Sequence, residues 1–119
     1  MLAHELEIFR ATRQLNVELL AYTKNVSREV KFLEYAEMRR KVTEALDMIY
    51  LINSEVDNEK AAELLRHYIF LLFGVQNRLR LLAETGYLKT GFKTKMIERI
   101  DECQKQAVRW KKYKTRSQN

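Results

Sequence analysis

Apolar side chains recur at steps of three, four and seven residues in four separate stretches of the chain. The stretches cover residues 8–26, 35–52, 61–82 and 96–110. Residues at these steps lie on one side of an α-helix, so each stretch predicts a helix with a single apolar stripe. The residues that we expect to form the four buried stripes are Ile8, Leu15, Leu19, Tyr22 and Val26; Tyr35, Met38, Val42, Ala45, Ile49 and Ile52; Ala61, Leu65, Tyr68, Leu72, Val75, Leu79 and Leu82; and Met96, Ile100, Cys103, Ala107 and Trp110.

Few residues interrupt these helices, because the chain has no proline and only three glycines. Asp57 stands where its carboxylate can accept hydrogen bonds from the first backbone N–H groups of the third helix. Gly86 stands where a helix C-terminus favours glycine. Polar residues 53–54 end the second helix, and we expect residues 90–91, Thr-Gly, to form a break before the fourth.

The connections between the four predicted helices are only a few residues long. Short connections force neighbours in sequence to run antiparallel, and a repeat of three and four gives the shallow crossing angle of a bundle. We therefore predict an all-α fold, an antiparallel up-down-up-down four-helix bundle, over residues 1–113. The basic residues 114–119 are predicted to be a disordered tail.

The third helix carries more apolar residues than one stripe needs. Ile69, Phe70, Leu71 and Phe73 add bulky groups on other sides of it. A helix that is apolar on most sides must be covered on most sides, so we predict a homo-oligomer with Ile69, Phe70 and Phe73 at the interface. The alternative is an uneven core that tucks these side chains under neighbouring helices. Residues of the second helix expected to help the oligomer are Leu46, Met48, Tyr50 and Leu51.

The pattern of polar residues contains no recognisable catalytic or metal-binding motif. Di-iron bundles need Glu-x-x-His pairs from two helices, but Glu63 and His67 are four residues apart and His4 stands alone near the start. Cys103 lies on an apolar stripe, which is typical of a small buried hydrophobe. Three distant glycines cannot form a phosphate-binding loop. We expect no enzymatic activity, no cofactor and no metal.

The sequence also bears on the compartment. A single cysteine cannot form an internal disulfide, and the first residues do not show a signal peptide pattern. The longest apolar run, residues 68–73, is far shorter than the roughly 18 residues that a membrane-spanning helix needs. We expect a soluble cytoplasmic protein that does not enter a membrane.

Positive charge exceeds negative charge, with 22 Lys and Arg against 16 Asp and Glu. Residues 42–64 carry one basic and six acidic side chains, whereas residues 66–99 carry seven basic and two acidic ones. A basic surface suits an anionic partner, and arginine binds phosphate through paired hydrogen bonds. The alternative is that these side chains only solvate helix surfaces or form pairs with nearby acids. The candidate contacts with RNA or DNA are Arg28, Lys31, Arg39, Arg40, Arg78 and Arg80.

Four short stretches, together with the register and length of the helices, carry a family resemblance. The stretches are Ser27-Arg28 followed by Lys31-Phe32-Leu33, Ile52-Asn53, Leu79-Arg80-Leu81-Leu82-Ala83-Glu84, and Trp110-Lys111-Lys112. Over residues 5–113 the chain resembles the four-helix bundle family of the accessory variability determinant (Avd) of diversity-generating retroelements. Relatives in that family are encoded in intervening sequences of bacterial rRNA genes. Family members usually carry Phe-Pro-Arg at the first turn, where this chain has Val26-Ser27-Arg28, so the arginine is kept and the proline is not.

The resemblance implies a pentameric barrel of bundles that associates with a reverse transcriptase and its template RNA, while the partner performs the catalysis. The family's basic positions correspond here to Arg28, Arg39, Arg40, Arg78 and Arg80. Two alternatives stay open. One is a bundle encoded in an rRNA intervening sequence, of unknown activity, and the other is a structural adaptor whose basic faces meet an acidic protein.

Overall fold

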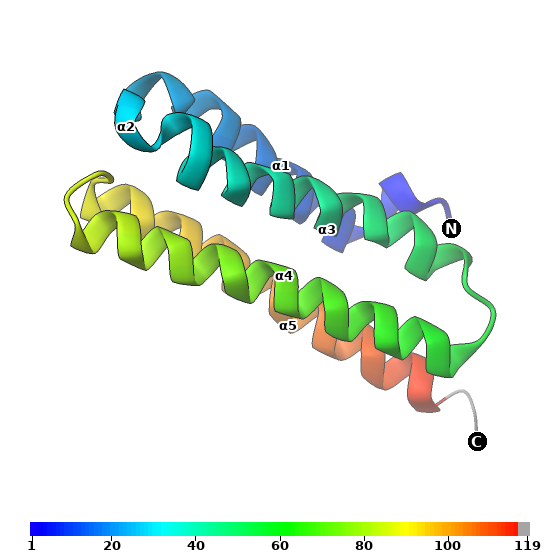
Figure 1. Cartoon of the computed structure of the whole chain (residues 1–119). Coiled ribbons are helices and arrows are strands. Elements are labelled where there is room, and N and C mark those ends of the chain that lie inside the picture. The colour runs from blue at the N-terminus through cyan, green and yellow to red at the C-terminus, as the bar shows by residue number, and fades with distance from the viewer. Residues whose placement is uncertain (117–119) are drawn as a thin grey trace.

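The computed structural model describes residues 1–116, and they form helices joined by short turns (Figure 1). The α-helices are α1 (Glu7–Tyr22), α2 (Arg28–Val30), α3 (Ala36–Ser54), α4 (Asn58–Glu84) and α5 (Thr90–Arg116). Short 3₁₀-helices cover Ala3–Glu5 and Thr23–Asn25, and a π-helix covers Lys31–Tyr35 between α2 and α3.

The four long helices form an antiparallel bundle, as the sequence predicts. Each packs against two others, because α1 contacts α3 and α5, and α4 contacts α3 and α5. In Figure 1, α3 and α4 lie in front of α1 and α5, and consecutive helices run in opposite directions. The result is an elongated molecule of 50 × 22 × 20 Å. The turn after α1 and the loop after α4 lie at the same end of it.

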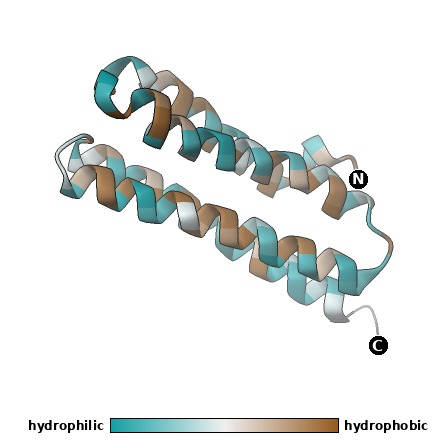
Figure 2. Cartoon of the chain, in the orientation of Figure 1, coloured by the Kyte–Doolittle hydropathy of each residue, from teal (hydrophilic) through white to brown (hydrophobic). Residues whose placement is uncertain are grey.

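The apolar stripes meet in a single core. Leu15, Ile49, Leu72 and Ile100 are completely buried, one from each long helix. Figure 2 shows the same pattern as brown and teal segments that alternate along every helix. The predicted stripes are confirmed except at Tyr22 and Trp110, which are half-buried and pack against the outside of the core. Other partly buried residues there include Leu6, Leu46, Ile69, Tyr87 and Phe92.

The ends of α4 follow the predicted chemistry. The Asp57 carboxylate accepts hydrogen bonds from the backbone N–H groups of Glu59 and Lys60, at 2.9 and 3.1 Å. At the other end Gly86 adopts a φ of 86°, and the Tyr87 N–H donates to the Leu82 carbonyl at 2.8 Å. This is the Schellman arrangement, in which glycine takes the left-handed conformation without steric strain.

Two predicted boundaries are wrong. Helix α5 begins at Thr90, so Thr90 and Gly91 form its first turn and not a break before it. Glycine is tolerated there because the first N–H groups of a helix have no partner inside the helix. Helix α5 also continues to Arg116, so residues 114–116 of the predicted disordered tail are helical. Residues 117–119 lie outside the described residues.

Within residues 1–116 no helix combines enough length with enough apolar character to cross a membrane.

One polar layer interrupts the core. The Thr12 hydroxyl donates to the Ile8 carbonyl at 2.7 Å and lies 2.6 Å from the Tyr68 hydroxyl, which must therefore be the donor in that second bond. The Cys103 sulfur is 3.9 Å from the same Thr12 oxygen. The layer thus links α1, α4 and α5 through groups that all find partners, as buried polar groups require.

Removing the Tyr68 hydroxyl tests this layer. Tyr68→Phe should lower the free energy of unfolding at neutral pH by about 0.5–1.5 kcal/mol, because a buried hydrogen bond is removed without creating a cavity. Urea unfolding followed by circular dichroism measures the change. Tyr113→Phe is the matched control, since Tyr113 is exposed. Equal midpoints for the two variants would contradict a stabilising role for the layer.

The buried Tyr68 hydroxyl should also make the free energy of unfolding depend on pH. Burial raises the pKa of Tyr68 above its ordinary value of 10.0, so the folded protein keeps the phenol protonated while the unfolded chain ionises it. The stability from this group is therefore complete below about pH 10 and is lost as the pH rises beyond that value. We expect Tyr68→Phe to lose less stability than wild type between about pH 7 and about pH 10.5. An equal loss of stability in the two proteins would contradict the raised pKa of Tyr68.

Candidate nucleic-acid interface

The net positive charge of the protein is concentrated at one end of the bundle. This end comprises residues 18–41 and 74–99, and it is bounded by two contacts between helices: the Lys41 side chain lies against Gly74, and Glu18 pairs with Arg99 at 2.5 Å. It holds twelve basic and six acidic residues, whereas the rest of the chain holds ten of each. The basic end therefore accounts for the entire net charge of +6.

The six predicted contact residues all lie in the basic end, but they differ in their ion pairs. Arg40 pairs with Glu37, and Arg78 lies 3.8 Å from Glu34. The other four have no carboxylate within 4.0 Å among the described residues, and they are Arg28, Lys31, Arg39 and Arg80. Arg28 and Arg80 are exposed, and Lys31 and Arg39 are partly exposed.

The structure does not bring these six side chains to one face. Arg78 lies on the α3 side of α4, beside Glu34. Arg80, two residues further, borders a groove on the α5 side that Lys93 also lines. Two residues correspond to more than half a helical turn, so the two arginines point in very different directions. The candidate surface therefore wraps around the end of the bundle.

Arg39 extends this surface to the α1 side. Its carbonyl accepts a hydrogen bond from Thr43 at 3.0 Å, one turn further along the same side of α3, and Thr43 meets Asn16 of α1 at 3.4 Å. Arg40 lies one residue further around α3 and is exposed. The candidate surface thus includes three sides of the basic end.

Sequence reasoning did not single out Lys89 and Lys93, which lie close to the turn that contains Lys24. Lys89 and Lys93 lie at the start of α5, and Lys24 lies in the turn after α1. Lys24 and Lys89 are exposed, and no ion pair is recorded for any of the three among the described residues. The useful signal is the antiparallel topology, because it places the turn after α1 beside the loop after α4. Counting charges along the sequence cannot show that these two connections lie beside each other.

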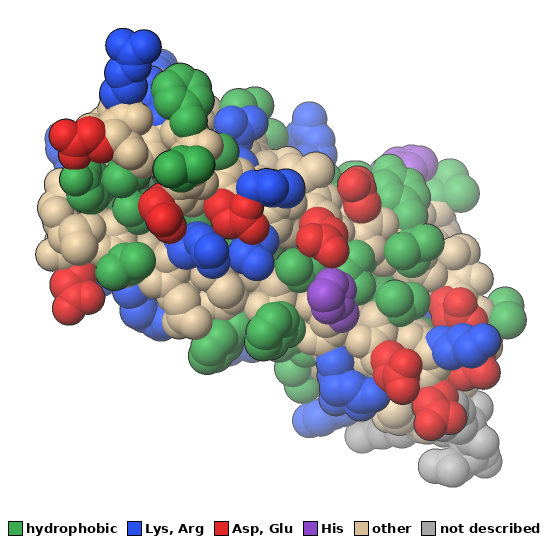
Figure 3. All heavy atoms as spheres, viewed as in Figure 1, with side chains coloured by type: hydrophobic (Ala, Val, Ile, Leu, Met, Phe, Trp, Pro, Cys, Tyr) green, Lys and Arg blue, Asp and Glu red, His purple; other side chains and the backbone are tan. Residues whose placement is uncertain are grey.

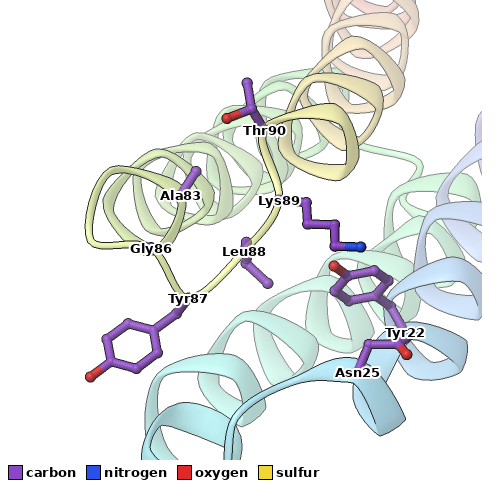
Figure 4. Close-up of a pocket in the computed structure, with 8 residues that line it drawn as sticks. All are labelled: Tyr22, Asn25, Ala83, Gly86, Tyr87, Leu88, Lys89 and Thr90. Atoms are coloured by element: carbon purple, nitrogen blue, oxygen red, sulfur yellow. The ribbon is translucent and has the colours of Figure 1, made fainter.

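A cavity of about 710 Å³ lies between these two connections (Figure 4). Its lining is largely polar and includes Tyr22, Asn25, Lys89 and Thr90. In Figure 4 the Lys89 side chain extends toward Tyr22, whereas the Tyr87 ring points away from the cavity. The Tyr22 ring also stacks on Phe92, with centroids 3.6 Å apart. The cavity is open to solvent and belongs to the basic end, and Lys89 supplies a positive charge to its lining.

The π-helix before α3 determines which side chains this end exposes. Val30 and Tyr35 are both buried although they are five residues apart, a spacing that an α-helix cannot keep on one side. The i→i+5 hydrogen bonding of a π-helix brings them to the same side. The Tyr35 hydroxyl then reaches the Leu19 carbonyl of α1. Phe32 and Leu33, in the middle of this turn, are 70% and 75% exposed.

The residues predicted to form an oligomer interface separate into two groups. Phe70 and Phe73 are 72% and 53% exposed on α4, so neither is tucked under a neighbouring helix. Ile69 is half-buried and packs against the core, and Leu71 is buried. On α3, Tyr50 and Leu51 are exposed, while Leu46 is half-buried and Met48 is buried, so Met48 cannot contribute surface as predicted. Figure 3 shows green hydrophobic side chains at several places on this face, interspersed with charged ones.

The residues considered as metal ligands lie apart from one another. Among residues 1–116 no three His, Cys, Asp or Glu side chains come close enough to hold a metal ion. His67 instead lies 3.4 Å from Glu44 of α3, and Cys103 belongs to the buried layer around Thr12. Burial raises the pKa of the Cys103 thiol, which keeps it in its unreactive protonated form.

No family model, no curated protein and no solved structure matches this chain. The resemblance to the Avd bundle family therefore stays a prediction from the sequence.

Proposed function

We propose that the protein is a nucleic-acid-binding accessory protein without catalytic activity of its own, and that RNA or DNA binds to the basic end of the bundle. The concentration of the whole net charge in residues 18–41 and 74–99 carries this proposal. A nucleic acid presents a dense row of phosphates, and cations that neutralise them release condensed counterions, which drives binding with little dependence on sequence.

The unpaired cations supply the contacts in this proposal. Arg28, Lys31, Arg39 and Arg80 have no carboxylate within 4.0 Å among residues 1–116, so a phosphate that binds them breaks no ion pair there. Arg40 and Arg78 would first have to leave Glu37 and Glu34, which reduces their net contribution. The distribution of the four unpaired residues over several sides of the end suits a flexible strand that bends around it.

The resemblance to the Avd family extends the proposal to a partner. In that reading the protein associates with a reverse transcriptase and supplies positive charge for its template RNA. The related bundle encoded in an rRNA intervening sequence would use the same basic end. The neighbouring genes separate the two, because a reverse transcriptase gene beside template and variable repeats favours the first and an rRNA operon favours the second.

We also propose that copies of the chain associate through Phe70 and Phe73. Two large exposed phenyl rings three residues apart on α4 form an apolar area that the bundle does not cover. A pentamer is the number that the resemblance implies.

Removing the unpaired cations tests the binding surface. The change of Arg28, Lys31, Arg39 and Arg80 together to Gln should weaken binding to RNA and flatten the fall of log affinity with log salt, by about 0.7–0.9 for each phosphate that is no longer neutralised. Glutamine keeps the helix propensity and the aliphatic stem, so the fold should be unaffected. Fluorescence anisotropy with a labelled RNA at several salt concentrations measures both quantities.

The matched control removes four positive charges from the other end of the bundle. Arg13, Lys60, Lys105 and Lys112 changed to Gln lower the net charge equally, and no ion pair is recorded for them among the described residues. This control should keep the wild-type salt slope. Equal losses in the two variants would mean that net charge alone attracts RNA. Wild-type protein that fails to bind any nucleic acid at low salt would exclude the proposed function and favour the adaptor.

The association through α4 is tested with Phe70→Glu. The substitution places a charge where only an interface would bury it, so it should dissociate the oligomer while the helix content stays the same. Light scattering gives the mass, which is 14.3 kDa for one chain. Tyr113→Glu, at a similarly exposed ring on α5, is the control and should leave the assembly intact. A wild-type protein that is monomeric at micromolar concentration would refute the proposal.

A further inference from the structure

Phe32 is a large aromatic side chain that lies exposed on the surface of the bundle. It lies in the π-helix at the basic end, and its ring is 70% exposed. The two ring contacts recorded among the described residues join Phe9 with Tyr50 and Tyr22 with Phe92, and neither involves Phe32. Together with the neighbouring Leu33, which is also exposed, the ring forms an apolar area that the fold does not cover.

The cations nearest to Phe32 in sequence are available to a ligand. Arg28 precedes Phe32 by four residues, about one helical turn, and Lys31 is its direct neighbour. Neither has a carboxylate within 4.0 Å among the described residues.

The acids of the same segment are already engaged. Glu29 accepts a hydrogen bond from the Tyr87 hydroxyl at 2.6 Å, and Glu34 lies 3.8 Å from Arg78. Both partners come from the α4 helix and the loop after it, so these contacts hold the acids toward the body of the bundle. The exposed part of the segment is therefore an apolar ring with two free positive charges.

We infer that the ligand of the basic end is single-stranded nucleic acid, with one unpaired base stacked on Phe32 and the adjoining phosphates bound by Arg28 and Lys31. This inference rests on the proposed function and narrows it. Bases in a duplex are already stacked on each other and show only their edges in the grooves, so a phenyl ring on a convex turn cannot reach their faces. In a single strand the faces are free, and aromatic stacking combined with cationic contacts to the backbone is the common way to bind it.

The charge around Phe32 also argues against a protein as its main occupant. An apolar protein groove that covered Phe32 and Leu33 would desolvate Arg28 and Lys31 as well, and an unpaired charge is costly to bury. A phosphate backbone avoids that penalty, because it supplies the opposite charge at the same place.

The test compares Phe32→Ala with Leu33→Ala, a neighbour that is equally exposed but has no ring. The probes are a labelled single-stranded oligouridine and an RNA duplex of the same length. Phe32→Ala should weaken binding of the single strand by between about fivefold and about a hundredfold, the range for loss of one stacked base. Its salt slope should equal that of wild type, because stacking releases no counterions. Leu33→Ala should bind the single strand as wild type does, and wild type should bind the duplex more weakly.

A second variant retains the ring system. Phe32→Trp should keep or increase the affinity for oligouridine, and the added tryptophan fluorescence should be quenched on binding, relative to wild type with Trp110 alone. Circular dichroism checks that all three variants keep their helix content.

The outcomes separate the inference from the function on which it rests. Wild-type affinity in Phe32→Ala, equal losses in the two alanine variants, or a preference for the duplex would overturn the stacking role, while salt-dependent binding would still support the basic end. Failure of wild type to bind either RNA would remove the proposed function itself.

Discussion

The bundle depends on the burial of four apolar stripes, one from each long helix. No disulfide can hold the helices together, since the chain has a single cysteine, so the packing of one stripe against two neighbours must supply the stability. That packing also fixes the positions of the helices relative to one another along the bundle axis. Once Thr12, Tyr68 and Cys103 meet in one layer, the turn after α1 and the loop after α4 must end near each other. The basic end is thus a consequence of helix register.

The basic end is kept at some expense of stability. Helix α5 has no acidic residue in its first turn, whereas α1, α2, α3 and α4 each have one. Acids near a helix N-terminus are favourable and cations there are not, by about 0.3–1 kcal/mol per charge. Lys93 therefore opposes the dipole of its own helix. Departures of this kind from local preference are expected where a surface serves a purpose other than folding.

Much of the fold could be predicted from the sequence, because the deciding features are local. The spacing of Leu65, Leu72 and Leu79 defines a helix face without knowledge of any partner, and Asp57 and Gly86 act on their own helix ends. The π-helix could not be predicted in this way, since Val30 and Tyr35 are five residues apart and so fall outside the repeat of three and four. The start of α5 was also missed, because the expectation for Gly91 came from helix interiors.

The candidate site was harder to predict, because it depends on contacts between helices. The sequence identified arginines 78 and 80 as a pair, but only the fold shows that Glu34 lies beside the first and not the second. Likewise, Ile69 and Phe70 are neighbours in sequence but differ in burial. Ile69 packs against the core, whereas Phe70 faces solvent. The contribution of Lys89 could be recognised only after the fold brought two distant connections together.

The elongated shape of the molecule has an electrostatic consequence, because its net charge lies toward one end. A rod 50 Å long with its net charge in the half toward one end has an electric dipole along its axis. In the field of any polyanion such a rod turns its charged tip forward before contact, which favours productive encounters. The opposite tip, where basic and acidic residues balance, then stands several nanometres from the polyanion.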